Sequence, residues 1–203
     1  AAEGRRADLI AGNNVLAQVP DVNDFVAGIA LLLAPGGVVT IEFPHLERTI
    51  AGCQFDQIYH EHFSYFSLLA AERIFARHGL TLFDVDELPT HGGSLRLYFR
   101  HATEPAPAVD IAVDRLRERE RALGYDDPAR LAAFRGVVEA TKRSLLRFLI
   151  EAKAGGKRIV GYGAPGKGNT LLNYCGIRTD FVDFLVDRNP YKHGRFTPGM
   201  HIP

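Results

Sequence analysis

Short apolar runs alternate with a segment of helical periodicity at the start of the chain. The run at 7–12 ends in a polar pair, Asn13 and Asn14, as a buried parallel strand does where it delivers a loop to a site. Apolar side chains then recur at helical spacing over 25–33, until a proline and two glycines end the pattern. The β-branched run at 38–43 predicts a second buried strand. Strand, helix and strand at this spacing indicate a parallel crossover unit.

The pattern changes over the next fifty residues from parallel to antiparallel connections. Residues 67–79 read as a helix with a serine cap and a closing His-Gly. Two strands follow at 80–85 and 94–99, and the turn-rich residues 88–93 between them permit only an antiparallel pair. The fold class is therefore α/β, drawn as the second half of a nucleotide-type domain. The first half, with its glycine-rich cofactor turn, is not in this sequence.

A small Thr/Pro/Ala linker at 103–108 is a candidate domain boundary. The segments 110–123 and 128–154 beyond it are rich in Arg, Glu, Ala and Leu, with apolar residues at helical intervals. We expect two helical stretches here. Their alternating charges are most simply a solvated face.

A glycine-rich turn dominates the last fifty residues. Glycines at 161, 163 and 166 satisfy G-x-G-x-x-G after a strand and before an expected helix at 170–174, so backbone amides could approach a phosphate. A second strand at 181–186 ends in Asp187, where a dinucleotide fold places its ribose-binding acid. A Walker A loop is excluded because Gly168 stands where Ser or Thr would bind magnesium. The pattern fits phosphate binding and also a glycine turn that binds nothing.

The densest group of ionisable side chains is the run 59–63, which holds a tyrosine, two histidines and a glutamate between apolar neighbours. Partly sheltered groups of these types are those whose proton affinities shift most, so the run is typical of an acid/base site. Two alternatives stay open. The histidines could ligate a metal with His45, Asp56 and Glu61, or they could be hydrogen-bonded core residues without chemistry.

Composition narrows the function classes further. The 203 residues carry 24 basic and 24 acidic side chains, which gives no net field to attract nucleic acid or an anionic membrane. Cys53 and Cys175 form neither a zinc pattern nor a disulfide framework. With no apolar run of membrane-spanning length, we expect a cytoplasmic protein. Met200 is the only methionine, so we expect the sequence to be an internal piece of a longer protein.

Several motifs, in order along nearly the whole chain, together resemble the S-adenosylmethionine-dependent sugar C-methyltransferases. The motifs are NNVLA at 13–17, EFPHL at 42–46, YHEHFSY at 59–65, LPTHGGSLR at 88–96, GYGAPGKGNT at 161–170 and GRFTPG at 194–199. These enzymes methylate C3 of nucleotide-linked 4-keto deoxysugars. Family members have an N-terminal zinc-binding domain, a class I methyltransferase domain and a Rossmann-like C-terminal domain.

The resemblance implies a division of the chain into three parts. Residues 1–102 would be the C-terminal half of the methyltransferase (Rossmann-like) domain, 103–154 a helical connection, and 155–203 an incomplete Rossmann-like domain that binds the nucleotide sugar. The zinc cysteines would lie upstream, so no metal is expected in this chain. The cofactor would be S-adenosylmethionine, with only part of its pocket present, and the fragment alone is expected to be inactive.

The resemblance also implies roles for individual residues. His62 would be the base that removes the C3 proton, Glu61 would orient it or shuttle the proton, and Tyr59 would contact the sugar oxygens or the enolate. The cofactor would be contacted by Asn13, Asn14 and Gln18. The expected contacts to the diphosphate and nucleoside of a dTDP-sugar are Ala164, Lys167, Asn169, Thr170, Asp187 and Arg188.

One position departs from the family pattern. After the NNVLA motif the family commonly has histidine, where this chain has Gln18, and glutamine is neither an acid nor a base. Two other functions remain as alternatives to a methyltransferase. One is an NAD-type oxidoreductase that uses the glycine turn, and the other is a non-catalytic nucleotide-sugar-binding module in which residues 59–62 are structural.

Overall fold

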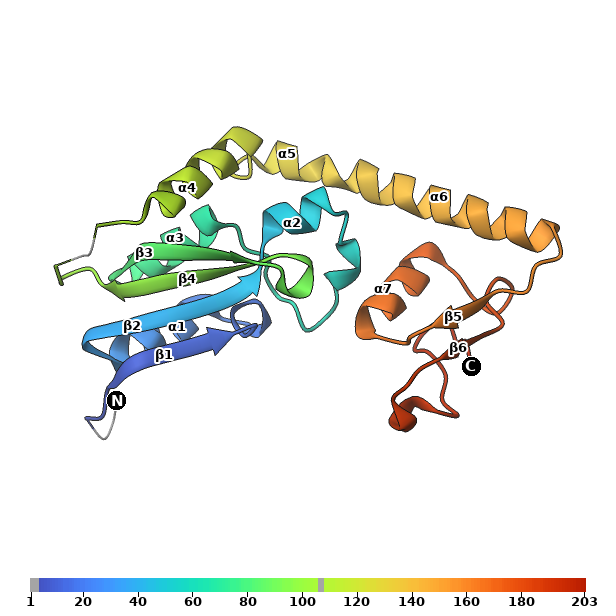
Figure 1. The fold of residues 1–203 in the computed structure, drawn as a ribbon, viewed down its shortest axis with the longest axis horizontal. Helices are drawn as coiled ribbons and strands as arrows, with labels where there is room; N and C mark the ends of the chain where they lie inside the picture. Colours follow the sequence, from blue (N-terminus) through green and yellow to red (C-terminus); the bar gives the residue numbers. More distant parts are fainter. Residues whose placement is uncertain (1–3, 106–107) are drawn as a thin grey trace. The chain divides into compact units, whose positions relative to one another are not determined.

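The computed structural model describes residues 4–105 and 108–203, which fall into two compact units (Figure 1). The first unit is Ala1–Gln54 with His60–Ala132, and the second is Phe55–Tyr59 with Ala133–Pro203. Within the described part of the chain, no helix has the length and apolar character needed to cross a bilayer.

The first unit is built on a four-stranded mixed sheet in the order β1-β2-β4-β3. Its strands are β1 (Ala7–Asn13), β2 (Leu33–Pro44), β3 (Leu80–Leu88) and β4 (Ser94–His101). The pair β1 and β2 is parallel, whereas β4 is antiparallel to both β2 and β3. The predicted parallel unit and the predicted antiparallel pair are both confirmed.

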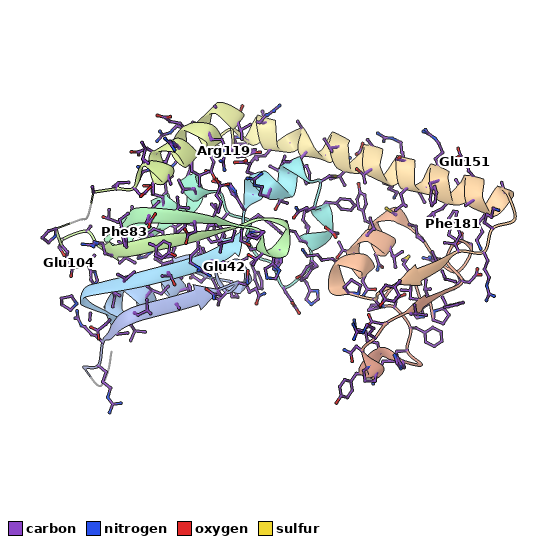
Figure 2. All side chains as sticks on the ribbon, in the orientation of Figure 1. Glu42, Phe83, Glu104, Arg119, Glu151 and Phe181 are labelled. Atoms are coloured by element: carbon purple, nitrogen blue, oxygen red, sulfur yellow. The ribbon has the colours of Figure 1, made fainter. Side chains whose placement is uncertain are left out.

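One face of this sheet packs against helices and carries the larger hydrophobic core. The helices of the unit are α1 (Val22–Leu32), α2 (Leu46–Ala51), α3 (Leu68–Arg77), α4 (Ile111–Leu123) and α5 (Pro128–Ala132). Alternate residues of β2 and β4, such as Val39, Ile41 and Leu97, are fully buried in this core. Residues between them, including Glu42 and Arg96, point to the other face, as the period of two requires. Figure 2 marks Glu42 near the end of β2.

The second strand begins earlier than its sequence predicts. The β-branched run indicated a strand at 38–43, but β2 starts at Leu33. The register between β1 and β2 shifts after Ala7, and Gly37 lies so close to the backbone that an added Cβ would come within 3.1 Å of the Ala7 oxygen. Gly37 therefore allows β1 and β2 to pair closely at a point where the sequence pattern indicated only the end of a helix.

The second unit has its own smaller core and a two-stranded parallel sheet. It contains α6 (Phe134–Ala154), β5 (Val160–Tyr162), α7 (Gly166–Cys175) and β6 (Phe184–Val186), with short 3-10 turns at Phe55–Gln57 and Pro190–Lys192. The helix predicted at 170–174 starts four residues earlier, directly at Gly166. The glycine turn therefore leads straight into the first turn of α7.

The two units are compact groups of contacting residues and are not the three domains expected from the sequence. The division into domains after residues 102 and 154 therefore remains a proposal. In the structure, α4 and α5 belong to the first unit and α6 to the second. The predicted linker at 103–108 falls partly on 106–107, which lie outside the described residues.

The solvated face predicted for 110–123 is wrong for one residue. Glu120 of α4 is fully buried, and its carboxylate accepts hydrogen bonds from the backbone N–H groups of Leu68 and Leu69 at 2.7 and 2.9 Å. The same carboxylate lies 2.8 Å from Nε2 of His45, which is also fully buried. A buried carboxylate thus joins α4 to the first turn of α3, where the helix dipole favours negative charge.

Candidate functional site

Polar side chains gather at the carboxyl ends of β1 and β2, the edge where open α/β sheets bind ligands. Asn14 follows β1, and its backbone N–H donates to the Glu42 carbonyl at 2.8 Å. Its side-chain nitrogen lies 3.2 Å from Nε2 of His91, while its side-chain oxygen is buried without a hydrogen-bond partner. Asn13 and Gln18 are exposed beside it. The three residues predicted to contact the cofactor therefore share one edge of the sheet.

The acid/base run is held against the same edge by its backbone. Residues 59–61 form a bend and turn, after which Phe63 N–H donates to the Ala17 carbonyl at 2.8 Å. His62 is partly buried, and its ring packs edge-on against Tyr65 with 6.1 Å between centroids. Glu61 is exposed. The segment is therefore folded back at 59–61 and is not an extended strand.

Tyr59 belongs by contacts to the second unit, unlike the two residues predicted to act with it. Its segment, Phe55–Tyr59, includes a phenylalanine whose ring packs against Tyr174 of α7 at 5.1 Å between centroids.

The geometry of the described residues does not favour the metal alternative. Among them, no group of three or more His, Cys, Asp or Glu side chains is placed to hold a metal ion. His45, one of the suggested ligands, is engaged with Glu120 in the buried pair described above.

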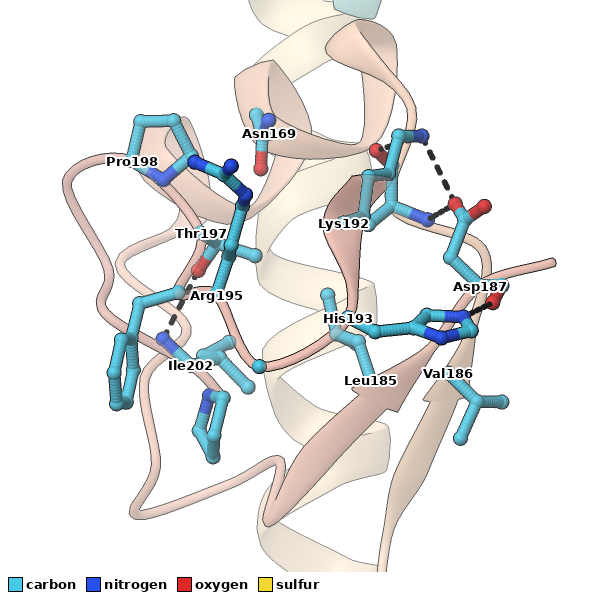
Figure 3. A pocket seen from close by; sticks show the side chains of 14 residues that line it. Asn169, Leu185, Val186, Asp187, Lys192, His193, Arg195, Thr197, Pro198 and Ile202 are labelled. Carbon is cyan, nitrogen blue, oxygen red and sulfur yellow. Dashed lines mark hydrogen bonds and ion pairs between the residues drawn. The ribbon is translucent and has the colours of Figure 1, made fainter. Parts of the chain in front are cut away.

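A pocket of about 430 Å³ opens in the second unit at the carboxyl end of β6 (Figure 3). Three residues predicted to bind substrate line it, namely Ala164, Asn169 and Asp187. The side-chain oxygen of Asn169 is buried without a hydrogen-bond partner. The other three predicted residues, Lys167, Thr170 and Arg188, are not among the lining residues.

Asp187 organises the mouth of this pocket. Its carboxylate accepts hydrogen bonds from the Asn189 N–H at 2.9 Å, the Ala164 N–H at 2.7 Å and Lys192 Nζ at 3.0 Å. These bonds, the two backbone ones first, hold the pKa of the Asp187 carboxyl well below its usual range. Both carboxylate oxygens therefore accept hydrogen bonds within the protein, as Figure 3 shows for Lys192.

The sequence places further hydrogen-bond donors and charge after β6, which suit a nucleotide ligand or a solvated loop, but they were not among the residues predicted to bind substrate in the pocket. Lys192, His193 and Arg195 line it together with the apolar ring of Phe196. Lys192 also donates to the Ala164 carbonyl at 2.9 Å, which links the loop after β6 to the glycine turn.

Comparison with known proteins gives matches over nearly the whole chain. Residues 89–203 match the family described as C-methyltransferase C-terminal domain, and residues 1–85 match a methyltransferase domain family. The C-methyltransferase NovU of Streptomyces niveus is 36% identical over 200 residues, which cover 97% of this chain and 47% of that protein. The chain thus spans less than half the length of this relative.

Solved structures give weaker likenesses. A LepI complex with SAM matches 48% of this chain and 27% of its own, at 13% identity and a TM-score of 0.40. A DhpI-SAM-HEP complex matches 47% of this chain and 51% of its own, at 22% identity and a TM-score of 0.37.

Proposed function

Because this chain belongs to the C-methyltransferase C-terminal domain family, we propose that it forms part of an S-adenosylmethionine-dependent enzyme that methylates C3 of a dTDP-linked 4-keto deoxysugar. The match of residues 1–85 to a methyltransferase domain supports the same conclusion for the first unit. The activity belongs to the whole protein, because the chain spans only 47% of its relative NovU.

The observation that carries the proposal is the pocket of the second unit, which lies within the matched family domain. Lys192, His193 and Arg195 bring cationic or hydrogen-bond-donating groups to its wall. Guanidinium and ammonium groups bind phosphate oxygens strongly, so the wall suits a diphosphate. Phe196 adds an apolar ring on which a nucleoside base can lie.

The edge of the first unit suits part of the methyl donor. S-adenosylmethionine carries an ammonium group and ribose hydroxyls, which are hydrogen-bond donors. The unpartnered buried oxygen of Asn14 and the exposed amides of Asn13 and Gln18 can accept from such donors. When bound, the cofactor supplies an electrophilic methyl group on sulfur.

The chain's own residues would perform the proton transfer. A ketone at C4 acidifies the proton on C3, and an imidazole is a suitable base because it titrates near neutral pH. His62 is assigned this role, and its ring packs edge-on against Tyr65. Glu61, exposed next to it, orients the base or passes the proton to solvent.

The alternative of an NAD-type oxidoreductase is less well supported. In a dinucleotide fold the acid after the second strand accepts from the ribose hydroxyls. Here the Asp187 carboxylate already accepts from Ala164, Asn189 and Lys192, which leaves fewer of its lone pairs for that contact.

The substitution His62→Asn in the full-length protein tests the proposed base. We expect methyl transfer to a dTDP-4-keto sugar to fall about 100-fold or more, because asparagine keeps a polar side chain but cannot accept the proton. Calorimetry should show unchanged dTDP binding and no NAD binding.

His60→Asn is the matched control, since it makes the same change two residues away on an exposed side chain. Unchanged turnover in His62→Asn would remove His62 as the base. Tight NAD binding by the wild-type protein would favour the oxidoreductase instead.

A further inference from the structure

The turn between β3 and β4 holds an imidazole to which no role has been assigned. His91 is exposed at the sheet edge, and its Nε2 lies 3.2 Å from the side-chain nitrogen of Asn14. Both residues have left-handed backbone conformations, with φ of 54° and 56°. A non-glycine residue adopts this conformation at a cost, and such strain is concentrated at functional sites.

The surrounding contacts fix this turn firmly. The Gly92 carbonyl accepts from Gln54 Nε2 at 2.9 Å, and an added Cβ on Gly92 would come within 2.6 Å of that side chain. Thr90 Oγ1 donates to the Glu42 carboxylate at 2.9 Å, and Glu42 also accepts from Arg96 at 2.7 Å. His91 is thus presented by a rigid support, which a side chain needs for precise contact with a ligand.

The loop after β1 contacts His91 and also the segment that carries the proposed base, His62. Asn14 begins the loop after β1, and Ala17, three residues later, accepts the backbone hydrogen bond from Phe63. His62 directly precedes Phe63. Both imidazoles are therefore tied to one short loop at the ligand-binding edge of the first unit.

The hydrogen bond from Asn14 determines which ring nitrogen of His91 carries its proton. An amide nitrogen donates, so Nε2 must accept, and the proton of the neutral imidazole lies on Nδ1. Asn14 thereby leaves His91 with an N–H donor that none of its described contacts uses.

We propose that His91 donates a hydrogen bond from Nδ1 to the C4 oxygen of the substrate and stabilises the enolate, with Asn14 as the residue that positions its tautomer. This inference rests on the proposed function. When the C3 proton passes to His62, the bonding pair of C3–H becomes the enolate and the C4 oxygen gains negative charge. The pair then forms the bond from C3 to the methyl carbon, the sulfonium leaves as a thioether, and the C4 carbonyl re-forms. His91 keeps its proton throughout and acts as an oxyanion donor.

The test measures methyl transfer and exchange of the C3 proton with D₂O in the full-length protein. His91→Ala, which has no side-chain donor, should lower kcat about 100-fold, the effect typical of a lost oxyanion donor. It should lower the exchange rate similarly, while the KM of the sugar nucleotide and the Kd for dTDP stay within twofold.

A second variant keeps the histidine and changes the partner of its Nε2. In Asn14→Asp the carboxylate would accept from Nε2–H, so at a pH where the imidazole is neutral the proton leaves Nδ1. Nitrogen-15 NMR of the imidazole should report this switch, and at that pH kcat should fall as in His91→Ala. The double variant should be no slower than either single variant, since both remove the same donor.

His78→Ala is the matched control. Nε2 of His78 also lies close to an asparagine, 3.3 Å from Oδ1 of Asn23. His78 stands just before the start of β3, whereas the His91 turn follows the other end of that strand. If the wild-type protein transfers methyl groups and His91→Ala does so within twofold of its rate, the proposed role of His91 alone is overturned. A wild-type protein that neither binds dTDP nor methylates a 4-keto sugar would overturn the proposed function and this inference with it.

Discussion

Asp187 shows how a single side chain organises the pocket of the second unit. Because its carboxylate accepts from two backbone N–H groups and Lys192, we expect Asp187→Asn to loosen the loop after β6. An amide can accept with only one oxygen, so at least one of these contacts is lost. Affinity for dTDP, measured by calorimetry, should fall about tenfold, as expected for one charge-assisted hydrogen bond.

The same substitution has a pH signature. The folded pKa of Asp187 is depressed, so its stabilising contribution is complete above the unfolded pKa and is lost as pH falls through the folded value. The difference in Tm between wild type and Asp187→Asn should therefore be constant above about pH 5 and shrink below about pH 4. Asp180→Asn, an exposed neutralisation in the same unit, should show no such loss. A difference that grows towards low pH would contradict this account.

At the scale of elements, α4 is joined to α3 and α2 by one buried carboxylate. Glu120→Gln should destabilise the protein by about 1–3 kcal/mol, because its amide nitrogen would face backbone donors or His45 in a site that excludes water. Urea denaturation followed by circular dichroism measures this change. Glu118→Gln, an exposed position two residues earlier on the same helix, should stay within about 0.5 kcal/mol of wild type. Equal stability of the two variants would show that the buried cluster contributes nothing.

The elements could be predicted from the sequence where a single periodicity held. Alternating or helical patterns located the strands of the mixed sheet and the helix that begins after Ser67. The burial of Glu120 could not be foreseen, because its partners lie more than fifty residues away and its own helix reads as charged throughout. The early start of β2 also depends on a distant contact, the approach of β1 to Gly37. In the sequence, a glycine at this position indicates a turn whether or not another strand lies beside it.

The candidate site was predictable in the same uneven way. Local motifs pointed to His62 and to the glycine turn, but the pairing of Asn14 with His91 joins positions 77 residues apart. The lining of the pocket by Lys192, His193 and Arg195 likewise depends on how the loop after β6 folds back towards the glycine turn. Sequence shows which side chains could act, whereas tertiary contacts decide which of them meet.

At the scale of the whole molecule, each unit has its own core, which predicts that the two lose structure separately. Leu149→Ala removes a buried side chain from the smaller core and should cost about 2–5 kcal/mol. We expect hydrogen exchange to show faster exchange in α7 and β6, with the amides of β2 and β4 unchanged. Leu97→Ala, the same substitution in the larger core, should give the reverse pattern. If either substitution accelerated exchange equally in both units, the chain would unfold as one cooperative body, and the pocket of the second unit would depend directly on the core of the first.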